Sequence, residues 1–560
     1  MPPASTDTRR TSSPVTEAAT HTPAQIRALR LLVLAAVFVC AACGLVYELA
    51  LVALGSYLLG SSITQTAIVI SVSMFAMGVG AVAVKPLLNR PLSGFVGVEI
   101  ALGVVGGFSV PALYASFAWL HAYTPAMVAA AFAIGALVGA EIPLLMGLLQ
   151  RLRAQDPAHA VADINAVDYV GALVGGLAFP FLLLPFAGLL EGTLLVASLN
   201  VAAAWVVAVG FVLSGFGAPD PVSARVGRAR RLVAVSAVCV LIGAALGVMA
   251  WRASAFEASA QQVLYRDPIV YSARSDYQSL VVTRGAVAGG NFADLRLFLD
   301  GDLQFSSVDE YRYHEMLVHP ALNGPRERVL VLGGGDGLAL REILRTPGVE
   351  EVTLVDLDPA VVDLARSYEP IVELNEHSWD DERVSYVPAD AFTWVRDQLD
   401  ADAPNVYDAV IVDFPDPDST ALAKLYATEM YQMVRGLLAP QGRMVVQSGS
   451  PFFAPDAFWS IKNTIAASGF ATTAYQADVP SFGNWGFVLA APLDGGSGSD
   501  QAPGPQVALA DDAPPMRFLT PELLDAAQVF PADRAARPTK VSTLLNPAIL
   551  EYSTKGWVGY

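Results

Sequence analysis

The sequence predicts a multi-span α-helical membrane domain followed by an α/β, Rossmann-like domain with a small β-sheet on its N-terminal side. Of the 560 residues, 54% are hydrophobic and only 15% are charged, which is typical of membrane proteins. Apolar stretches of spanning length fill the first half of the chain. In the second half, the apolar run 329–332 leads directly into Gly333, Gly334 and Gly335 and then a predicted helix at 338–344. Such a strand, glycine turn and helix begin a doubly wound, nucleotide-binding sheet.

The first half contains a tail and a helical domain. Residues 1–26 are rich in Ser, Thr, Pro and Ala and lack periodicity, which predicts a disordered tail. The transmembrane domain is expected over 27–252, with about seven helices and no cleavable signal. The spanning stretches lie near 31–58, 65–87, 93–117, 125–149, 167–189, 192–214 and 232–251.

Acidic residues lie in or at the edges of these stretches, namely Glu48, Glu99, Glu141, Asp163 and Asp168. Charges at membrane depth are costly and usually face the interior of a helix bundle. Two interpretations stay open: a path or binding site for a polycation, or acids that lie near the interface or are paired within the bundle.

Small and sulfur-containing residues in these spans point to packing. The glycine-rich run 171–176 predicts close helix contacts. Cys40, Cys43 and Cys239 lie in apolar runs, and their spacing predicts neither a disulfide framework nor a metal site.

The net charge of the chain is −18, which argues against nucleic acid and for cationic partners.

In the second half, apolar and polar residues alternate as they do in soluble domains. Residues 256–320 are predicted to form a small antiparallel β-sheet. The Rossmann-like domain is expected at 325–560, with further strands at 351–355, 384–388, 407–412 and 442–447. A flexible insertion is predicted at 492–515, which is rich in Gly, Ser, Pro, Ala and Asp, and the remaining tail is expected to pack back on the domain.

Acidic residues follow the predicted strands, where ligands of such sheets bind. Asp356, which closes the second strand, is expected to bind ribose hydroxyls, and Asp390 with Ala391 suits an adenine edge. Asp413 and Asp416 follow the fourth strand in a turn stiffened by prolines, and they could flank a diamine, with Asp413 accepting a proton. A loop carboxylate or helix N-cap is the alternative for each of these acids.

Asp336 lies inside the glycine loop and indicates the charge of the ligand. A carboxylate there would repel the amino-acid end of S-adenosylmethionine. It would attract the bare aminopropyl ammonium of decarboxylated S-adenosylmethionine. Another nucleotide-binding Rossmann domain is the alternative for the loop taken alone.

Five motifs together resemble spermidine synthase, the polyamine aminopropyltransferase family, over about residues 260–490. They are 276–279, 299–301 with Gln304, 309–315, 333–337 and 413–417. The helical half resembles that of the membrane-bound members. The resemblance implies a methyltransferase-type version of the Rossmann-like fold. It also implies transfer of an aminopropyl group from decarboxylated S-adenosylmethionine to putrescine, giving spermidine and methylthioadenosine.

The resemblance also implies roles for individual residues. Asp413 would be catalytic; Gln278, Asp336, Asp356, Asp390 and Ala391 would bind the co-substrate; Tyr277, His314, Asp336 and Asp416 would bind the amine. Decarboxylated S-adenosylmethionine is then a co-substrate, with no permanent cofactor and no metal. The partners are putrescine or a similar diamine and the lipid bilayer, with no nucleic acid, and homo-oligomer formation stays open.

Two departures from the family pattern concern the acceptor amine. Phe482 stands where soluble members usually carry Tyr, so one hydroxyl is lost, and residues 417–420 lack the usual Gly-Pro. The identity of the accepted amine therefore stays open. A polyamine transporter or sensor, with a soluble polyamine-binding domain, and a membrane-bound methyltransferase are the rival functions; Asp336 argues against the second.

Two arguments about sidedness in the cell membrane disagree. Lys and Arg are concentrated before the first span and after the second, fourth and sixth, which predicts a cytoplasmic N-terminus. Seven crossings would then place residue 252 onward outside the cytoplasm. Because decarboxylated S-adenosylmethionine is made in the cytoplasm, we instead predict a cytoplasmic catalytic domain and an even number of crossings, with the first or seventh stretch not spanning.

Overall fold

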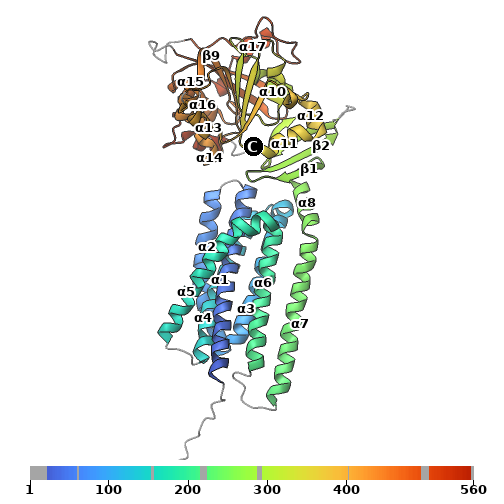
Figure 1. Cartoon of the computed structure of the whole chain (residues 1–560), viewed down its shortest axis with the longest axis vertical. Helices are drawn as coiled ribbons and strands as arrows, with labels where there is room; N and C mark the ends of the chain where they lie inside the picture. Colours follow the sequence, from blue (N-terminus) through green and yellow to red (C-terminus); the bar gives the residue numbers. More distant parts are fainter. Residues whose placement is uncertain are drawn as a thin grey trace, which may run out of the picture. The chain divides into compact units, whose positions relative to one another are not determined.

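The computed structural model describes residues 22–59, 62–152, 157–214, 223–286, 293–401, 403–493 and 503–556. The chain divides into two compact units, Met1–Leu264 and Tyr265–Tyr560, which are coloured blue to green and green to red in Figure 1. Most of the predicted disordered tail lies outside the described residues. Its last residues do not, and the prediction is wrong for 23–26, because helix α1 begins at Pro23.

The first unit is a bundle of long helices. They are α1 (Pro23–Leu59), α2 (Ser62–Ala83), α3 (Pro91–Ala115), α4 (Tyr123–Arg151), α5 (Pro157–Ala178), α6 (Leu184–Ser214) and α7 (Ser223–Trp251), followed by the shorter α8 (Ala253–Leu264). Within the described part of the chain, six helical runs are long and apolar enough to cross a membrane. One of them, Val161–Ser214, covers 54 residues, or about 80 Å of helix. Gly188, at φ 67° and ψ −176°, interrupts that run in α6.

Glycines allow helices of this unit to approach closely. A Cβ at Gly171 would lie 2.4 Å from the carbonyl oxygen of Phe38, and one at Gly175 would lie 2.4 Å from that of Ala42. The glycine-rich run of α5 therefore packs against α1, as the sequence predicted. Gly139 of α4 contacts the backbone of Met77 in α2 in the same way.

The second unit begins with a four-stranded antiparallel sheet in the order β1-β2-β3-β4. The strands are β1 (Ile269–Arg274), β2 (Ser279–Ala286), β3 (Ala293–Leu299) and β4 (Asp302–Ser306). The predicted small sheet is thus present, but its predicted start at residue 256 is wrong, because 256–264 lie in α8 and their apolar residues follow a helical period.

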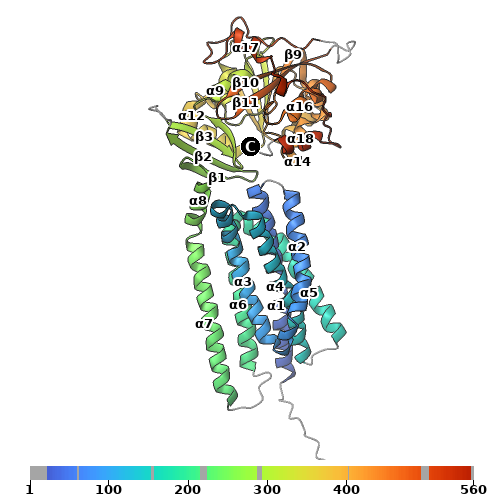
Figure 2. The ribbon, with the colours of Figure 1, turned by 180° about the vertical axis from the view of Figure 1, so that it is seen from behind.

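A seven-stranded sheet forms the centre of this unit, in the order β10-β11-β9-β8-β5-β6-β7. The strands are β5 (Arg328–Gly333), β6 (Glu351–Asp356), β7 (Val384–Pro388), β8 (Tyr407–Asp413), β9 (Leu438–Gln447), β10 (Phe470–Val479) and β11 (Gly483–Pro492). Strands β5 to β9 run parallel to one another, whereas β11 pairs antiparallel with both β9 and β10, which are labelled in Figure 2. Gly333 pairs with Asp413, so the glycine loop and the predicted base leave the sheet at the same edge.

Helices cover both faces of this sheet, so the unit has two apolar cores. Val329 and Val331 of β5 enter one core, and Leu330 and Leu332 enter the other, as the two-residue period of a strand requires. The first core contains residues of α9 (Glu310–Val318), α10 (Leu338–Leu344), α11 (Pro359–Ser367), α12 (Glu369–Leu374) and α17 (Pro521–Ala527). The second contains residues of α13 (Ala391–Leu399), α14 (Thr420–Ala423), α15 (Thr428–Leu437), α16 (Pro455–Ala467) and α18 (Ala548–Gly556).

The segment after β11 differs in part from the prediction of a flexible insertion. Residues 494–502 lie outside the described part. From 503 the chain is packed: Val507 is buried, and the Thr473 hydroxyl donates to the carbonyl of Pro505 at 2.7 Å. The prediction is therefore wrong for 503–515, because burial of Val507 and the hydrogen bond to Thr473 of β10 hold this segment against the domain.

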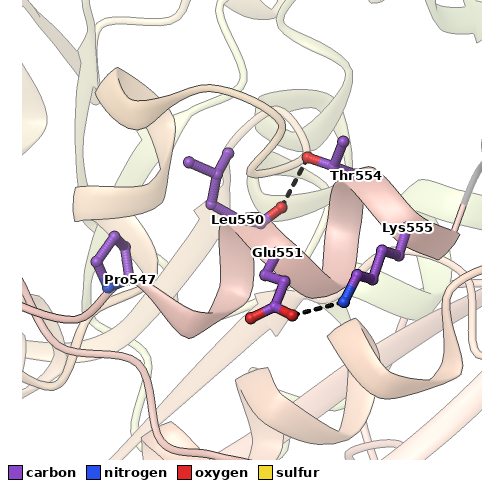
Figure 3. Close-up of a pocket in the computed structure, with 5 residues that line it drawn as sticks. All are labelled: Pro547, Leu550, Glu551, Thr554 and Lys555. Carbon is purple, nitrogen blue, oxygen red and sulfur yellow. Dashed lines mark hydrogen bonds and ion pairs between the residues drawn. The ribbon is translucent and has the colours of Figure 1, made fainter.

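The C-terminal segment packs back on the domain, as the sequence predicted, and ends in α18. Figure 3 shows a shallow pocket along that helix, with the Lys555–Glu551 ion pair at 2.5 Å. Its lining residues include none of the predicted site residues.

Candidate active site

Helix α9 positions several parts of the site through its polar residues. Asp309, just before the helix, accepts hydrogen bonds from the Ser481 backbone at 2.6 Å and from its hydroxyl at 2.7 Å. Glu315 accepts from the backbone N–H groups of residues 517–519, at 2.7–2.9 Å. The motif at 309–315 therefore ties the β10–β11 turn and the C-terminal segment to one helix.

His314 is held by a buried ion-pair network on the same helix. Its Nδ1 lies 3.0 Å from Glu310 Oε2, and Glu310 forms a two-fold interaction with the Arg341 guanidinium, with both distances 2.9 Å. Burial favours the neutral imidazole, but the hydrogen bond and charge of Glu310 outweigh it and raise the pKa of His314 above its usual 6.5. The ring is therefore fixed in place and biased towards a positive charge beside Asp336 and Asp413.

The glycine loop adopts a conformation that requires glycine. Gly333 and Gly334 have φ of 85° and 72°, and a Cβ at Gly333 would lie 2.2 Å from the carbonyl oxygen of Asp413. Asp336 Oδ1 accepts from the Leu338 N–H at 2.9 Å, so the carboxylate is anchored at the start of α10. Burial raises the pKa of Asp336, and an ammonium placed beside it would favour its charged form.

Asp356 links the end of β6 to this loop. Its Oδ2 accepts from the Gly335 N–H at 3.1 Å and its Oδ1 from the Asp358 N–H at 3.0 Å. Burial raises its pKa to about 6. Each oxygen keeps a further lone pair, so the carboxylate can still accept a hydroxyl donor.

Asp413 lies at the end of β8, and one of its carboxylate oxygens accepts a hydrogen bond from the protein. Its Oδ1 accepts from the Tyr313 hydroxyl at 2.5 Å, while Oδ2 faces Gly334, where an added Cβ would lie 3.5 Å from this oxygen. Burial raises the pKa of Asp413, opposed by the nearby His314. A raised pKa makes this carboxylate a better proton acceptor than a solvated aspartate.

Asp416 belongs to a second hydrogen-bonded group organised by Gln447. The Gln447 amide donates to Asp416 Oδ1 at 3.3 Å and to the Tyr426 hydroxyl at 2.7 Å, and it accepts from Trp485 Nε1 at 3.2 Å. Burial, together with the nearby charges of Asp418 and Asp302, raises the pKa of Asp416 to about 7. A cationic ligand would relieve this repulsion.

The other predicted residues lie around this centre. Gln278, in the β1–β2 turn, donates to Asp358 Oδ2 at 2.9 Å, and its neighbour Tyr277 is 54% exposed. Asp390 is the N-cap of α13, accepting from Thr393 N at 2.9 Å.

Asp390 is also paired with a cation. Its Oδ2 lies 2.8 Å from Lys424 Nζ. Burial alone would raise the pKa of Asp390, but the ion pair with Lys424 and the hydrogen bonds from Thr393 outweigh burial and lower this pKa. The N-cap alternative is therefore correct for its structural role, and Ala391 is the first, buried residue of that helix.

The arrangement combines a nucleotide-type glycine loop with carboxylates that lack a full set of partners. Asp336, Asp356 and Asp413 influence one another electrostatically, and His314, whose pKa is raised, is the group biased towards a positive charge near Asp336 and Asp413. Such a site can hold a positively charged ligand, orient it by hydrogen bonds and accept a proton from it.

Comparisons with known proteins agree with this chemistry. Residues 310–492 match the spermine/spermidine synthase domain. "Polyamine aminopropyltransferase 1" of Streptomyces coelicolor is 53% identical, covering 99% of both chains, and "Polyamine aminopropyltransferase" of Mycobacterium tuberculosis is 46% identical, covering 97% of this chain and 99% of that one. The chain belongs to the polyamine aminopropyltransferase family. It is therefore an aminopropyltransferase, as the motif resemblance predicted.

Solved structures of spermidine synthases are also similar to part of the chain. One, in complex with the transition-state analogue AdoDATO, is 25% identical with a TM-score of 0.40, covering 47% of this chain and 85% of that one. Another, from Thermotoga maritima, is 24% identical with a TM-score of 0.39 and the same coverage.

Several residues of the candidate site were not predicted from the sequence. Tyr313 and Glu310 lie in the recognised 309–315 motif, where their spacing from His314 is a signal. Gln447 ends the fifth parallel strand, a position at which polar residues often face ligands. Lys424 carries no comparable local signal, since it meets Asp390 only through the fold.

Proposed function

We propose that this aminopropyltransferase transfers the aminopropyl group of decarboxylated S-adenosylmethionine to putrescine or a similar diamine. The products are spermidine, when putrescine is the acceptor, and methylthioadenosine. In this proposal Gln278, Asp356, Asp390 and Ala391 bind the nucleoside, and Asp336 faces the aminopropyl ammonium. Tyr277, His314 and Asp416 contribute to the amine site.

The geometry of Asp413 is the observation that supports this proposal most. An alkylamine titrates near ~10, so the acceptor nitrogen must lose a proton before or during attack. Asp413 Oδ1 is held by Tyr313, and Oδ2 accepts no hydrogen bond from the described residues. That oxygen is therefore available to the acceptor amine.

The reaction then balances with groups of this chain. The nitrogen lone pair attacks the aminopropyl carbon next to the sulfonium. The new C–N bond forms as the C–S bond breaks, and its electron pair stays on sulfur, which becomes a neutral thioether. The proton leaving nitrogen passes to Asp413 Oδ2. The ion pair of His314 with Glu310 orients the imidazole beside the reacting centre.

Turnover of the purified full-length protein tests the proposal. Decarboxylated S-adenosylmethionine is supplied with putrescine, cadaverine or spermidine, and methylthioadenosine and the polyamine product are measured by mass spectrometry. We expect product with a diamine and none when S-adenosylmethionine replaces the decarboxylated form. Methyl transfer to any acceptor, or no turnover with all three amines, would contradict the proposal.

Asp336 provides a sharper test of the co-substrate. Asp336→Asn should weaken binding of decarboxylated S-adenosylmethionine more than binding of S-adenosylmethionine, because only the second has a carboxylate that Asp336 repels. Isothermal titration calorimetry of both ligands on both proteins measures this difference. Equal losses for the two ligands would mean that Asp336 does not select between them.

We further propose that the catalytic unit faces the cytoplasm, where its co-substrate is made. A fluorescent protein fused after Tyr560 should then be bright, and an alkaline phosphatase fusion at the same position should be inactive. The opposite pattern would support the positive-inside count over this assignment.

A further inference from the structure

Three side chains that could bind a metal ion meet inside the helical unit. They are Cys40 of α1, Glu99 of α3 and Glu141 of α4. The thiol sulfur and one oxygen of each carboxylate all lie within 4.8 Å of one another. All three side chains are buried, with exposures of 1%, 0% and 4%. No role in the aminopropyl transfer proposed above uses them.

The two carboxylates lack the partners that buried acids normally have. Neither oxygen of Glu99 has a hydrogen-bond partner among the described residues, and the same holds for Oε1 of Glu141. In contrast, Asp163 of the same unit forms an ion pair with Arg30 at 2.6 Å. Buried charges in proteins are paired or coordinate metals, so the placement of Glu99 beside the other two side chains fits a cation-binding site.

The backbone around these residues is closely packed, so the three helices are held at a defined spacing. Gly44, one turn after Cys40, faces Val138, whose Cγ2 would lie 3.2 Å from an added Cβ. Likewise, a Cβ added at Gly94 of α3 would lie 2.8 Å from Leu144 Cδ2 of α4. Helices α1, α3 and α4 lie side by side in both views (Figures 1 and 2).

We propose that Cys40, Glu99 and Glu141 bind a divalent metal ion of the zinc class. One thiolate and two carboxylates are a ligand set that zinc accepts, and three protein ligands leave one position of a tetrahedron open. At zinc–sulfur and zinc–oxygen distances of about 2.3 and 2.1 Å, neighbouring donors lie about 3.5 Å apart. The donors therefore need to move inward by about 1 Å, which side-chain rotation of the two glutamates allows.

The sulfur ligand favours a metal over an organic ammonium. A thiol is a weak hydrogen-bond acceptor, so Cys40 would add little to the binding of an amine. Thiolate is in contrast a preferred ligand of zinc and related borderline-soft ions. The −1 charges of both carboxylates and the thiolate would be largely neutralised by the ion, which removes the cost of burying them unpaired.

Cobalt provides a spectroscopic test on the full-length protein, purified in detergent without a polyhistidine tag and stripped with a chelator. Co²⁺ titration should give one bound ion per chain, with a sulfur-to-cobalt charge-transfer band in the near ultraviolet. Zn²⁺ should displace it. Cys40→Ser should abolish the band, and Glu99→Gln and Glu141→Gln should each weaken binding by at least about tenfold.

Matched variants decide whether the effect belongs to this site. Cys239→Ser removes a buried cysteine of α7 that lies outside the site, and Glu48→Gln removes an acid of α1 that lies outside the site. Both variants should leave the Co²⁺ titration unchanged. Loss of the band in Cys239→Ser, or unchanged binding in the Cys40, Glu99 and Glu141 variants, would overturn the proposal. The proposal would also be overturned if the wild-type protein bound neither Co²⁺ nor Zn²⁺. The same holds if putrescine binding required Glu99 and Glu141 and Co²⁺ binding did not.

A second measurement separates metal binding from folding and from catalysis. Zn²⁺ should raise the unfolding temperature of the wild-type protein and of Cys239→Ser more than that of Glu99→Gln, because stabilisation by a ligand grows with its affinity for the folded chain. This readout does not depend on aminopropyl transfer, so it stands even if the proposed reaction fails. Equal stabilisation of all variants by Zn²⁺ would place the ion elsewhere and refute the assignment.

Discussion

Glu310 in the catalytic unit and Glu99 in the helical unit are equally buried, at 1% and 0% exposure. Glu310 contacts both terminal nitrogens of Arg341 and the imidazole of His314. Glu99 has no partner for either oxygen among the described residues. Burial of an acid therefore does not reveal its state: the catalytic unit neutralises Glu310 with its own side chains, whereas Glu99 is the acid that we propose to bind a metal ion.

The proposed catalytic carboxylates lie between these extremes. Asp413 has one oxygen bonded to Tyr313, and Asp416 has one oxygen at 3.3 Å from Gln447. Partial pairing orients a carboxylate and still leaves an oxygen for a substrate amine. The degree of pairing therefore separates structural acids, catalytic acids and a candidate metal site within one chain.

The largest expected effect concerns the catalytic group of acids. Asp413→Asn keeps the shape of the side chain and removes the proton acceptor, so kcat should fall by roughly two to four orders of magnitude. Binding of decarboxylated S-adenosylmethionine, measured by calorimetry, should change far less.

Asp397→Asn is the matched control, because Asp397 is exposed and its ion pair with Arg396 lies on the surface. Its turnover should be that of the wild type. Near-normal turnover in Asp413→Asn would remove Asp413 from the mechanism.

The same substitution in the two units tests the comparison directly. Glu310→Met leaves His314 without its carboxylate and Arg341 with that of Glu342 alone, which should destabilise the catalytic unit by about 3–5 kcal/mol. Glu99→Met removes an unpaired buried charge, so in metal-free buffer it should stabilise the helical unit by about 1–3 kcal/mol.

Differential scanning calorimetry in detergent measures both shifts. Glu551→Met is the control: this residue forms an exposed ion pair with Lys555 of α18 (Figure 3), and surface ion pairs contribute little to stability. Shifts of the same sign for Glu310→Met and Glu99→Met would contradict the contrast between the units.

A smaller effect is expected in the pH profile. Asp416 has a pKa of about 7, raised by burial from 3.8, so it becomes charged only as pH rises through about 7. Because the charged form attracts the diamine, kcat/KM for putrescine should fall as pH is lowered below about 7. Asp416→Asn should lower kcat/KM at high pH and remove this acidic limb. An identical limb in Asp416→Asn would assign it to another group, such as Asp413.

The smallest effect concerns Phe482, whose ring lies 5.9 Å from that of Tyr313 and 5.2 Å from that of Trp485. Phe482→Tyr restores the hydroxyl that soluble aminopropyltransferases usually carry. One additional hydrogen bond of about 1 kcal/mol should lower the KM for a diamine about fivefold. Steady-state kinetics with putrescine and cadaverine measures it. A higher KM for both amines would show that the ring position does not serve the acceptor.

Much of the fold was predictable because its signals are local. The glycine loop, the helix at Leu338–Leu344 and the strands ending at Asp356 and Asp413 follow from periodicity and from the conformations that only glycine adopts. The common edge of these acids follows from a general rule of parallel sheets. The packing role of the glycines in α5 was likewise visible in their spacing.

Other features were decided by the tertiary structure. Each side chain's face on its element is encoded locally, but its partner depends on how two elements rotate and slide against each other. Lys424 meets Asp390, and Glu315 meets the N–H groups of 517–519, across long sequence separations. The ordered segment from 503 has no helical or strand period in sequence, and it is fixed by contacts such as the Thr473–Pro505 hydrogen bond and by burial of Val507.

Cys40, Glu99 and Glu141 show this division most clearly. The sequence identifies three costly or reactive residues in apolar helices, and the cysteine spacing alone indicated no metal site. Their donor atoms come within 4.8 Å only because α1, α3 and α4 pack in one particular rotation about their axes. Helical periodicity sets which face each residue occupies, whereas packing of the neighbouring helices decides which faces meet.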